Sequence, residues 1–279
     1  MKQRILSALI GIALLLVVLG LFETIVLNLA AALMIAVAAF EITRAVDPEQ
    51  PAFSRWLSIG FACLVPFSGR AMLLLLVFVY AVLTLACAVR RYPQVHVASV
   101  GLQIMMVTGV SGAFYCFLLI REYASSTLLA LYYLILVCGS AWLSDAGAYF
   151  IGCRFGKRKL CPAVSPKKSV EGFWGGLASG VLGNLLISFI FMQLQKGALA
   201  GYAGAGFDIN YLYVALVSPL LSMLGVLGDL SASMVKRSCG IKDYGTIMPG
   251  HGGVMDRFDS VLFIVPLVYL IMRCFPLAA

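Results

Sequence analysis

Apolar runs long enough to cross a lipid bilayer recur along this chain and leave few residues for any other structure. A transmembrane helix needs about 20 apolar residues. We expect nine spans, at residues 5–21, 25–43, 56–68, 71–89, 98–120, 127–150, 173–194, 211–231 and 259–274. Hydrophobic residues make up 62% of the chain and charged residues 11%, whereas soluble domains hold about 25% charged residues. The sequence therefore predicts an all-α integral membrane protein with about nine transmembrane helices.

Two of these spans have a second interpretation. The third span is short and could form a re-entrant hairpin with the fourth, between the bends at Pro66 and Gly69. The first span follows Lys2 and Arg4 and has the charge pattern of a signal peptide. Because further apolar spans follow it, rather than a soluble domain behind a cleavage site, we interpret it as an uncleaved anchor.

The distribution of lysine and arginine predicts the orientation. With a cytoplasmic N-terminus, 16 of the 20 basic residues lie in inner segments and 4 in outer ones, in agreement with the positive-inside rule. The polar loops 151–172 and 232–258 then face the cytoplasm. We divide the chain into N-terminal transmembrane helices with about five spans, residues 1–125, and a catalytic region, residues 126–279. The net charge of +8 indicates orientation and contact with anionic lipid rather than nucleic acid.

Two carboxylates lie unusually deep for a membrane protein. Asp145 and Asp229 stand at or inside the ends of the sixth and eighth spans. An ionised Asp at the bilayer centre costs about 2.5–3.5 kcal/mol, so such side chains face a polar cavity or a partner. Both belong at the cytoplasmic ends of their spans, which predicts a polar cavity that opens to the cytoplasm. The alternative is that each residue marks a helix end or pairs with a lysine.

Further carboxylates gather in the second polar loop. Asp256 and Asp259 are three residues apart and would share one face of a helix. Together with Asp229 they could provide the oxygen ligands of Mg²⁺, which usually takes one or two carboxylates plus substrate phosphate.

The same loop contains a glycine-rich turn around His251. Gly252 and Gly253 would let backbone N–H groups converge on a phosphate, or they would only return the chain to the membrane. We expect His251 to contact a phosphate or a carboxylate.

The first polar loop is rich in basic residues. Ser165, Lys167, Lys168 and Glu171 form the pattern of a phosphate-handling turn, since lysine can act as a mobile point charge toward a triphosphate. An alternative is that the basic residues only set the orientation of the chain in the membrane. This alternative suits Arg154 and its neighbours better than Lys167 and Lys168, which stand between Ser165 and Glu171.

Two motifs connect these loops to a known family. The run S-x-x-K-R-x4-K-D-x-G-x3-P-x-H-G-G-x-x-D-R-x-D, from Ser233 to Asp259, resembles the signature of phosphatidate cytidylyltransferases, the CDP-diacylglycerol synthases. D-x-G-A-Y-F from Asp145, with S-P-K-K-x-x-E-G from Ser165, resembles that family's second motif. The motifs cover about 60 residues, and the length, the span count and the loop placement extend the resemblance over the whole chain.

The resemblance implies a dimeric, multi-span enzyme of the bacterial inner membrane. Such an enzyme joins CTP and phosphatidate into CDP-diacylglycerol and releases pyrophosphate with Mg²⁺; a second metal or a monovalent cation stays open. On matching positions the resemblance makes Asp229, Asp256 and Asp259 metal ligands. It makes seven further residues candidates for contact with phosphates: Lys167, Lys168, Lys236, Arg237, Lys242, His251 and Arg257. We expect catalysis to depend on Asp229, Asp256, Lys236, Arg237, Lys242 and His251.

The chain departs from the family pattern at a few positions. Ala232 stands where the family commonly has Glu, which would remove a group that orients a metal-bound water or a lysine. Ser169 and Val170 replace a frequent Thr-Trp pair.

Three alternatives stay open from the sequence. A related cytidylyltransferase would act on another lipid phosphate. A cation-coupled transporter would use Asp145 and Asp229 as an ion relay, although transporters tend to place their sites near the midplane of paired repeats. A non-catalytic paralogue would explain Ala232.

Overall fold

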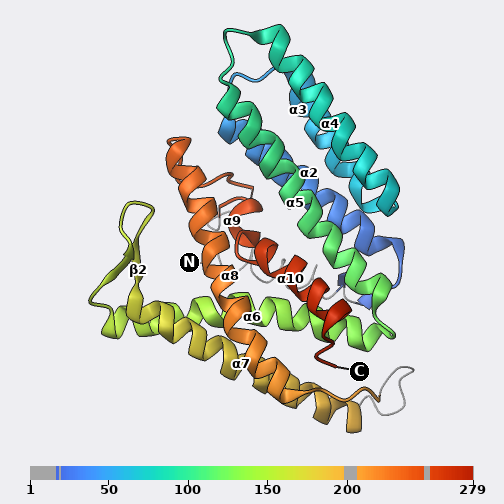
Figure 1. Ribbon diagram of the computed structural model, residues 1–279, viewed down its shortest axis with the longest axis vertical. Helices are drawn as coiled ribbons and strands as arrows, with labels where there is room; N and C mark the ends of the chain where they lie inside the picture. The colour runs from blue at the N-terminus through green and yellow to red at the C-terminus, as the bar shows by residue number, and fades with distance from the viewer. Residues whose placement is uncertain (1–16, 19, 198–205, 248–251, 279) are drawn as a thin grey trace. The chain divides into compact units, whose positions relative to one another are not determined.

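The computed structural model describes residues 17–18, 20–197, 206–247 and 252–278 (Figure 1). Its elements, in chain order, are α2 (Ile25–Val46), α3 (Ala52–Leu64), the 3-10 helix η1 (Val65–Phe67), α4 (Arg70–Arg91), α5 (Val97–Tyr123), α6 (Thr127–Phe155), β1 (Lys159–Cys161), β2 (Ser165–Ser169), α7 (Val170–Lys196), α8 (Tyr211–Ser238), α9 (Met255–Phe258) and α10 (Val261–Cys274).

Long apolar helices dominate the described part of the chain. There, α2, α4, α5, α6, α7 and α8 are long and apolar enough to cross a membrane. The shorter apolar helices, α3 with η1 and α10, coincide with the spans predicted at 56–68 and 259–274. The span predicted at 5–21 lies largely outside the described residues. The prediction of an all-α membrane protein is confirmed, and the number of nine spans stays a prediction.

The long helices continue past their predicted spans, and α6 and α8 do so furthest. α6 ends at Phe155 and α8 at Ser238, beyond the predicted ends at residues 150 and 231. Hydropathy detects only the apolar part of a helix, whereas the backbone hydrogen bonds of a helix can continue into water. As a result, Asp229 and Lys236 lie on one continuous helix.

The first polar loop contains a β-hairpin that the sequence did not predict. β1 pairs with β2 in antiparallel orientation, with Lys159 opposite Ser169 and Cys161 opposite Ser165. The strands are three and five residues long, too short for a recognisable alternation of polar and apolar residues.

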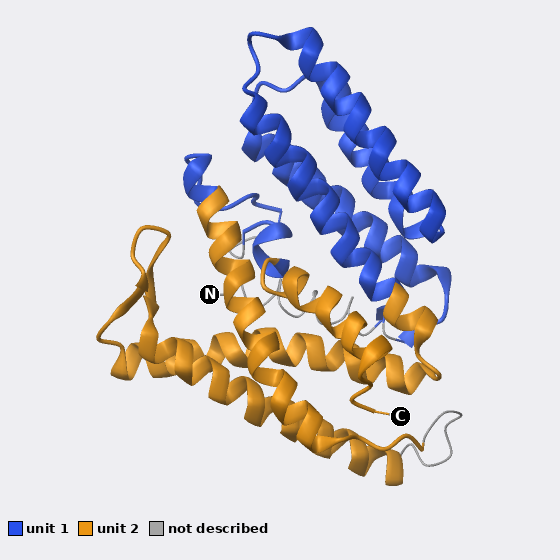
Figure 2. Cartoon of the chain, in the orientation of Figure 1, with its two compact units in different colours: residues 1–118, 236–258 blue, residues 119–235, 259–279 orange. Residues whose placement is uncertain are grey.

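The chain divides into two compact units (Figure 2). Unit 1 comprises residues 1–118 and 236–258, and unit 2 comprises residues 119–235 and 259–279. The second polar loop therefore belongs with the N-terminal helices. The division predicted between residues 125 and 126 stays a prediction about catalytic roles.

Polar side chains hold the helices of unit 1 together. The Gln50 side-chain amide donates a hydrogen bond to Gln103 Oε1 of α5 at 2.7 Å, and the Gln103 amide donates to Ser58 Oγ of α3 at 3.1 Å. Ser58 Oγ also lies 3.0 Å from the hydroxyl of Tyr80 in α4. Each of these side chains is buried, so their hydrogen bonds fix the helices more specifically than apolar contact would.

Close helix contact organises unit 2. α6 and α7 pack along their lengths, and glycines allow the approach: a Cβ added at Gly172 would lie 2.7 Å from the carbonyl oxygen of Ala148. Deeper in the unit, the Asn184 amide of α7 donates hydrogen bonds to Ser140 Oγ of α6 at 2.8 Å and Ser218 Oγ of α8 at 3.0 Å. Small residues and interhelical hydrogen bonds are typical of helix packing in lipid.

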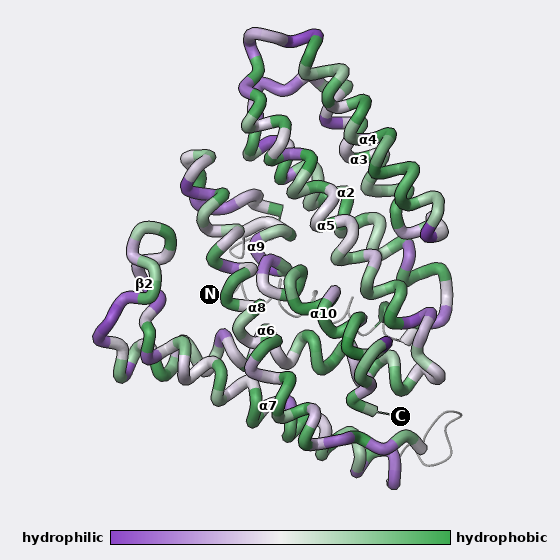
Figure 3. The backbone as a smooth tube through the Cα atoms, in the orientation of Figure 1, coloured by the Kyte–Doolittle hydropathy of each residue, from purple (hydrophilic) through white to green (hydrophobic). Residues whose placement is uncertain are grey.

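Large hydrophobic side chains point outward on the long helices. Leu74 and Phe78 of α4 are 75% and 66% exposed, and Leu182 of α7 and Leu216 of α8 are similarly open. Figure 3 shows the apolar character running along α4 and α7. Such surfaces suit contact with lipid rather than water.

Candidate functional site

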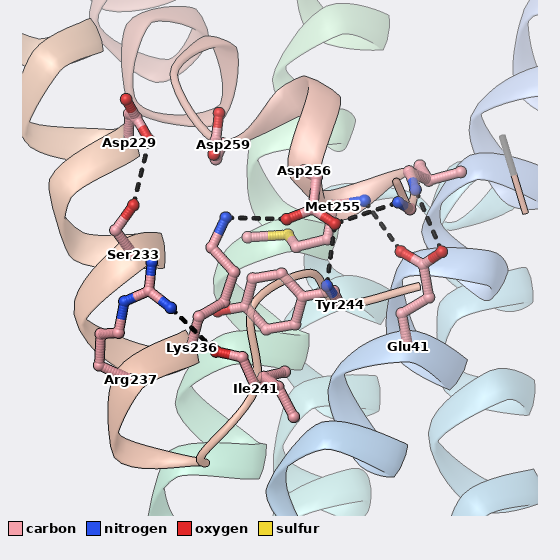
Figure 4. A network of polar contacts seen from close by, with 12 residues as sticks. Glu41, Asp229, Ser233, Lys236, Arg237, Ile241, Tyr244, Met255, Asp256 and Asp259 are labelled. Carbon is pink, nitrogen blue, oxygen red and sulfur yellow. Dashed lines mark hydrogen bonds and ion pairs between the residues drawn. The ribbon is translucent and has the colours of Figure 1, made fainter. Parts of the chain in front are cut away.

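Three predicted site residues of unit 2 lie together. They are Asp145 in α6, Lys168 in β2 and Asp229 in α8. Lys168 Nζ lies 2.5 Å from Asp229 Oδ2, and Asp145 interacts electrostatically with both residues. One turn further along α8, the Ser233 hydroxyl donates a hydrogen bond to Asp229 Oδ1 at 3.3 Å (Figure 4). Because the two carboxylates and the ammonium come from three elements, the fold brings them together rather than the local sequence.

The Lys168 ammonium keeps donor capacity in this arrangement. Its Nζ atom is buried and makes no directional hydrogen bond within the described chain, although the distance to Asp229 is that of an ion pair. The ion pair is the better description, because attraction between charges depends on distance rather than direction. Since a lysine ammonium carries three N–H donors, Lys168 can bind a phosphate oxygen while it stays beside Asp229.

A second ion pair lies in unit 1. Lys236 Nζ of α8 lies 2.8 Å from Asp256 Oδ1 of α9, and the two side chains are 10% and 4% exposed. Asp256 Oδ2 accepts hydrogen bonds from the backbone N–H groups of Tyr244 at 2.8 Å and Gly253 at 3.0 Å. Lys236 Nζ also lies 5.5 Å from the centre of the Tyr244 ring. Asp256 thus ties the end of α8, the loop and the glycine turn together (Figure 4).

The structure adds Glu41, which sequence reasoning missed. Glu41 lies in α2 and is 1% exposed. Its Oε1 accepts a hydrogen bond from Val254 N at 3.1 Å and its Oε2 one from Met255 N at 3.0 Å (Figure 4). An acidic residue inside an apolar span is itself a signal of function, and this rule, applied to the span at 25–43, would have identified Glu41.

The helical face predicted for Asp256 and Asp259 does not form. α9 ends at Phe258 and α10 begins at Val261, so Asp259 lies outside the helix that holds Asp256. Asp259 belongs to unit 2 and its Oδ1 accepts a hydrogen bond from Ser260 N at 2.8 Å. A spacing of three residues aligns side chains only where a helix continues through both.

Among the described residues, no group of three or more His, Cys, Asp or Glu side chains is positioned to hold a metal ion. The donors around Asp229, two carboxylates and a serine hydroxyl, are nevertheless all oxygen, which is the chemistry that Mg²⁺ prefers. Both carboxylate oxygens of Asp256 already bind donors of the chain. Both oxygens of Asp229 also have partners, but these are the side chains of Lys168 and Ser233 rather than backbone amides. Because side chains can rotate away, Asp229 fits a magnesium ligand better than Asp256 does.

The other basic candidates lie toward the surface of their units. Lys167, Arg237, Lys242 and Arg257 are exposed, and the Arg237 guanidinium donates to the carbonyl of Ile241 at 3.4 Å. Their exposed positions suit contact with a ligand that arrives from outside.

Glu171 has a structural partner. Its carboxylate accepts hydrogen bonds from the backbone N–H groups of Lys157 at 3.0 Å and Arg158 at 3.2 Å. Because Glu171 lies in the first turn of α7, these bonds attach the base of the β-hairpin to that helix. Ser165 lies on the strand that also carries Lys168.

The glycine-rich turn is described only from Gly252 onward; His251 lies outside the described residues. Gly252 has a φ of +86°, a backbone conformation that glycine adopts readily. The N–H of Gly253 points to Asp256 Oδ2, and the next two amides point to Glu41. The Gly253 amide, which the sequence suggested for a phosphate, is therefore used by a carboxylate of the chain.

A family model described as "Cytidylyltransferase family" matches residues 2–275. The chain belongs to the cytidylyltransferase family. This membership confirms the resemblance seen in the two sequence motifs.

Curated relatives of this chain are named phosphatidate cytidylyltransferase. The chain is 40% identical to the one from Bacillus subtilis over 160 residues, which is 57% of this chain and 54% of the relative. It is 46% identical to the one from Haemophilus influenzae over 138 residues, 50% of this chain and 43% of the relative. The matched part thus spans about half the length of these relatives.

Proposed function

We propose that this family member transfers the cytidylyl group of CTP to phosphatidate, which gives CDP-diacylglycerol and pyrophosphate. The observation that carries the proposal is the family match over residues 2–275. The names of relatives from several bacteria agree with it. Family membership lends no support to a cation-coupled transporter.

The reaction joins two anions, and the charged residues suit this task. A phosphate oxygen of phosphatidate attacks the α-phosphorus of CTP, a new P–O bond forms, and the bond between the α-phosphorus and the bridging oxygen breaks as pyrophosphate leaves. The nucleophile is already ionised, so the protein needs no strong base. The protein mainly offsets the repulsion between the phosphates of CTP and phosphatidate and aligns them for reaction. Lys168 with Asp229, and Lys236 with Asp256, provide ammonium groups held in place by carboxylates.

The family resemblance adds Mg²⁺ to this proposal. We propose Asp229 as its principal ligand. The family motif indicates Asp256 and Asp259 as further ligands. When bound, Mg²⁺ supplies positive charge against the phosphates of CTP. The all-oxygen donors around Asp229 support this choice.

The finer features of topology also belong to the proposal. We propose nine spans in the bacterial inner membrane, a cytoplasmic N-terminus, catalytic loops on the cytoplasmic side of a polar cavity, and a homodimer. Phosphatidate stays in the bilayer because each buried CH₂ group contributes about 0.8 kcal/mol, so its phosphate must reach the loops from the membrane surface.

The decisive assay uses purified protein in lipid nanodiscs, with labelled CTP and phosphatidate, with Mg²⁺ or with EDTA. We expect CDP-diacylglycerol from wild type only with Mg²⁺, and a loss of at least about 100-fold for Asp229→Asn. Asp208→Asn, which removes an exposed carboxylate of unit 2, should retain wild-type activity. Product from another lipid phosphate, but none from phosphatidate, would favour the related transferase. No CTP-dependent product from any lipid phosphate would overturn the proposed function.

A further inference from the structure

Glu41 makes an unusual pair of contacts for an acidic side chain inside a membrane-spanning helix. Its two carboxylate oxygens each accept one hydrogen bond, and the donors are the consecutive backbone amides of Val254 and Met255. These donors lie 213 and 214 residues away in the sequence. Met255 is the first residue of α9, so the negative charge stands at the start of the segment that carries Asp256.

Two carboxylates together hold three consecutive amides of this segment. Asp256 Oδ2 accepts from Gly253 N, and Glu41 accepts from the two amides that follow. Hydrogen bonds to an ionised acceptor contribute about 1.5–3 kcal/mol each. The conformation that presents Asp256 to Lys236 is therefore fixed from the α2 side.

Two glycines of the sequence signature are explained by the same carboxylate. A Cβ added at Gly245 would overlap Glu41 Oε1 and lie 2.7 Å from its carboxyl carbon. A Cβ at Gly253 would lie 2.6 Å from that carbon and 2.5 Å from Oε2. Glycine at these two positions leaves the space that the Glu41 carboxylate fills.

We propose that Glu41 is a positioning residue for cytidylyl transfer: it seats against Gly245 and Gly253 and holds the turn that orients the Lys236–Asp256 pair. This inference rests on the proposed function. Glu41 acts through the turn and does not itself contact the reacting phosphates. Its loss should therefore loosen residues 252–258 as well as slow the reaction.

The first test measures backbone hydrogen exchange in purified protein, followed by mass spectrometry of peptides that cover residues 252–258. Glu41→Gln keeps the size of the side chain but replaces one of the two acceptor oxygens by an NH2 group, which cannot accept a hydrogen bond. One amide is left without an acceptor, so exchange there should be at least about tenfold faster. Glu49→Gln, at an exposed position beyond the same helix, should leave exchange unchanged. Equal protection in wild type and Glu41→Gln would overturn the proposal, and this readout does not depend on the substrate.

The second test asks whether Glu41 and Gly245 share one space. Gly245→Ala should lower kcat/KM for CTP by about 10–100-fold, the usual effect of disturbing a supporting residue. Shortening the acid with Glu41→Asp should make room, so the double variant Glu41→Asp/Gly245→Ala should recover at least about threefold over Gly245→Ala alone. If the effects of the two single substitutions on kcat/KM simply multiply in the double variant, the proposed contact between Glu41 and Gly245 is contradicted. If wild type itself made no product from CTP and phosphatidate, the proposed function would fail, and hydrogen exchange would still decide the role of Glu41.

Discussion

At the scale of single residues, the acidic side chains differ by the partners that the fold gives them. Asp229 faces an ammonium and a hydroxyl, whereas Glu41 accepts hydrogen bonds from two backbone amides. Asp256 combines both kinds of partner. A carboxylate with exchangeable partners can bind a ligand, and one that is bound to backbone amides mainly fixes the chain. The sequence alone made Asp229 and Asp256 equivalent metal ligands and did not distinguish their partners.

Replacing Asp256 by Asn should destabilise the protein as well as inactivate it. The variant leaves the buried Lys236 ammonium without its counter-charge, and breaking a buried ion pair costs about 3–5 kcal/mol. Unfolding of the detergent-solubilised protein measures this loss. The double variant Lys236→Met/Asp256→Asn should recover part of the stability but none of the activity. Wild-type stability of Asp256→Asn would show that the pair contributes little to the fold.

The two adjacent lysines of β2 should respond differently to substitution. Lys168 is paired with Asp229, whereas Lys167 is exposed. Lys168→Met leaves two neighbouring carboxylates without their ammonium, so we expect kcat/KM for CTP to fall by about 100-fold. Lys167→Met should cost about tenfold or less, since exposed charges are screened by solvent. Equal losses in steady-state assays would contradict the distinction between the two lysines.

At the scale of elements, polar residues join the helices of unit 2. Asn184 of α7 is buried and bonds to serines of both α6 and α8. Asn184→Ala removes both hydrogen bonds, and such bonds contribute about 0.6–1.7 kcal/mol in membrane proteins. We expect a loss of about 1–2 kcal/mol, which unfolding in mixed micelles can measure. A variant as stable as wild type would indicate that apolar packing alone holds these helices.

The close contact of α6 and α7 predicts that alanine is tolerated differently at two glycines. Gly172→Ala would place a Cβ 2.7 Å from the Ala148 carbonyl oxygen, and a backbone carbonyl cannot move aside cheaply. We expect a loss of about 1–3 kcal/mol. A Cβ at Gly112 of α5 meets no atom within 4 Å, so Gly112→Ala should be neutral or should stabilise by up to about 1 kcal/mol. The opposite order of stabilities would contradict the packing described above.

The elements differ in how far the sequence could predict them. Six predicted spans coincide with long apolar helices, because hydropathy reports directly on such helices. They are the spans at 25–43, 71–89, 98–120, 127–150, 173–194 and 211–231. The hairpin of β1 and β2 was missed because its strands are too short to show a period. Lys168 was identified from its motif, but its pairing with Asp229 depends on the packing of β2 and α8. The contact of Glu41 with residue 254 was beyond reach, since one sequence contains no record of contacts between distant residues.

At the scale of the whole molecule, the orientation in the membrane can be tested with the native cysteines. All eight are free thiols. Cys161 and Cys239 lie in the two polar loops, and Cys274 lies at the end of α10. In single-cysteine variants, a membrane-impermeant maleimide should label the two loop positions only in inverted vesicles and Cys274 only from the opposite side. Labelling of the loop cysteines in intact spheroplasts would reverse the proposed topology.

The packing of the Glu41 carboxylate against Gly245 and Gly253 also limits which substitutions these three positions can accept. Either glycine can acquire a side chain only if position 41 first becomes smaller, and a loss of the acid removes the reason for both glycines. Across homologous chains, a side chain at position 245 or 253 should therefore occur only together with a smaller residue at position 41. A chain divided between α2 and the signature would lose the contacts of Glu41 with Val254 and Met255. We therefore expect selection against a gene fission at such a point.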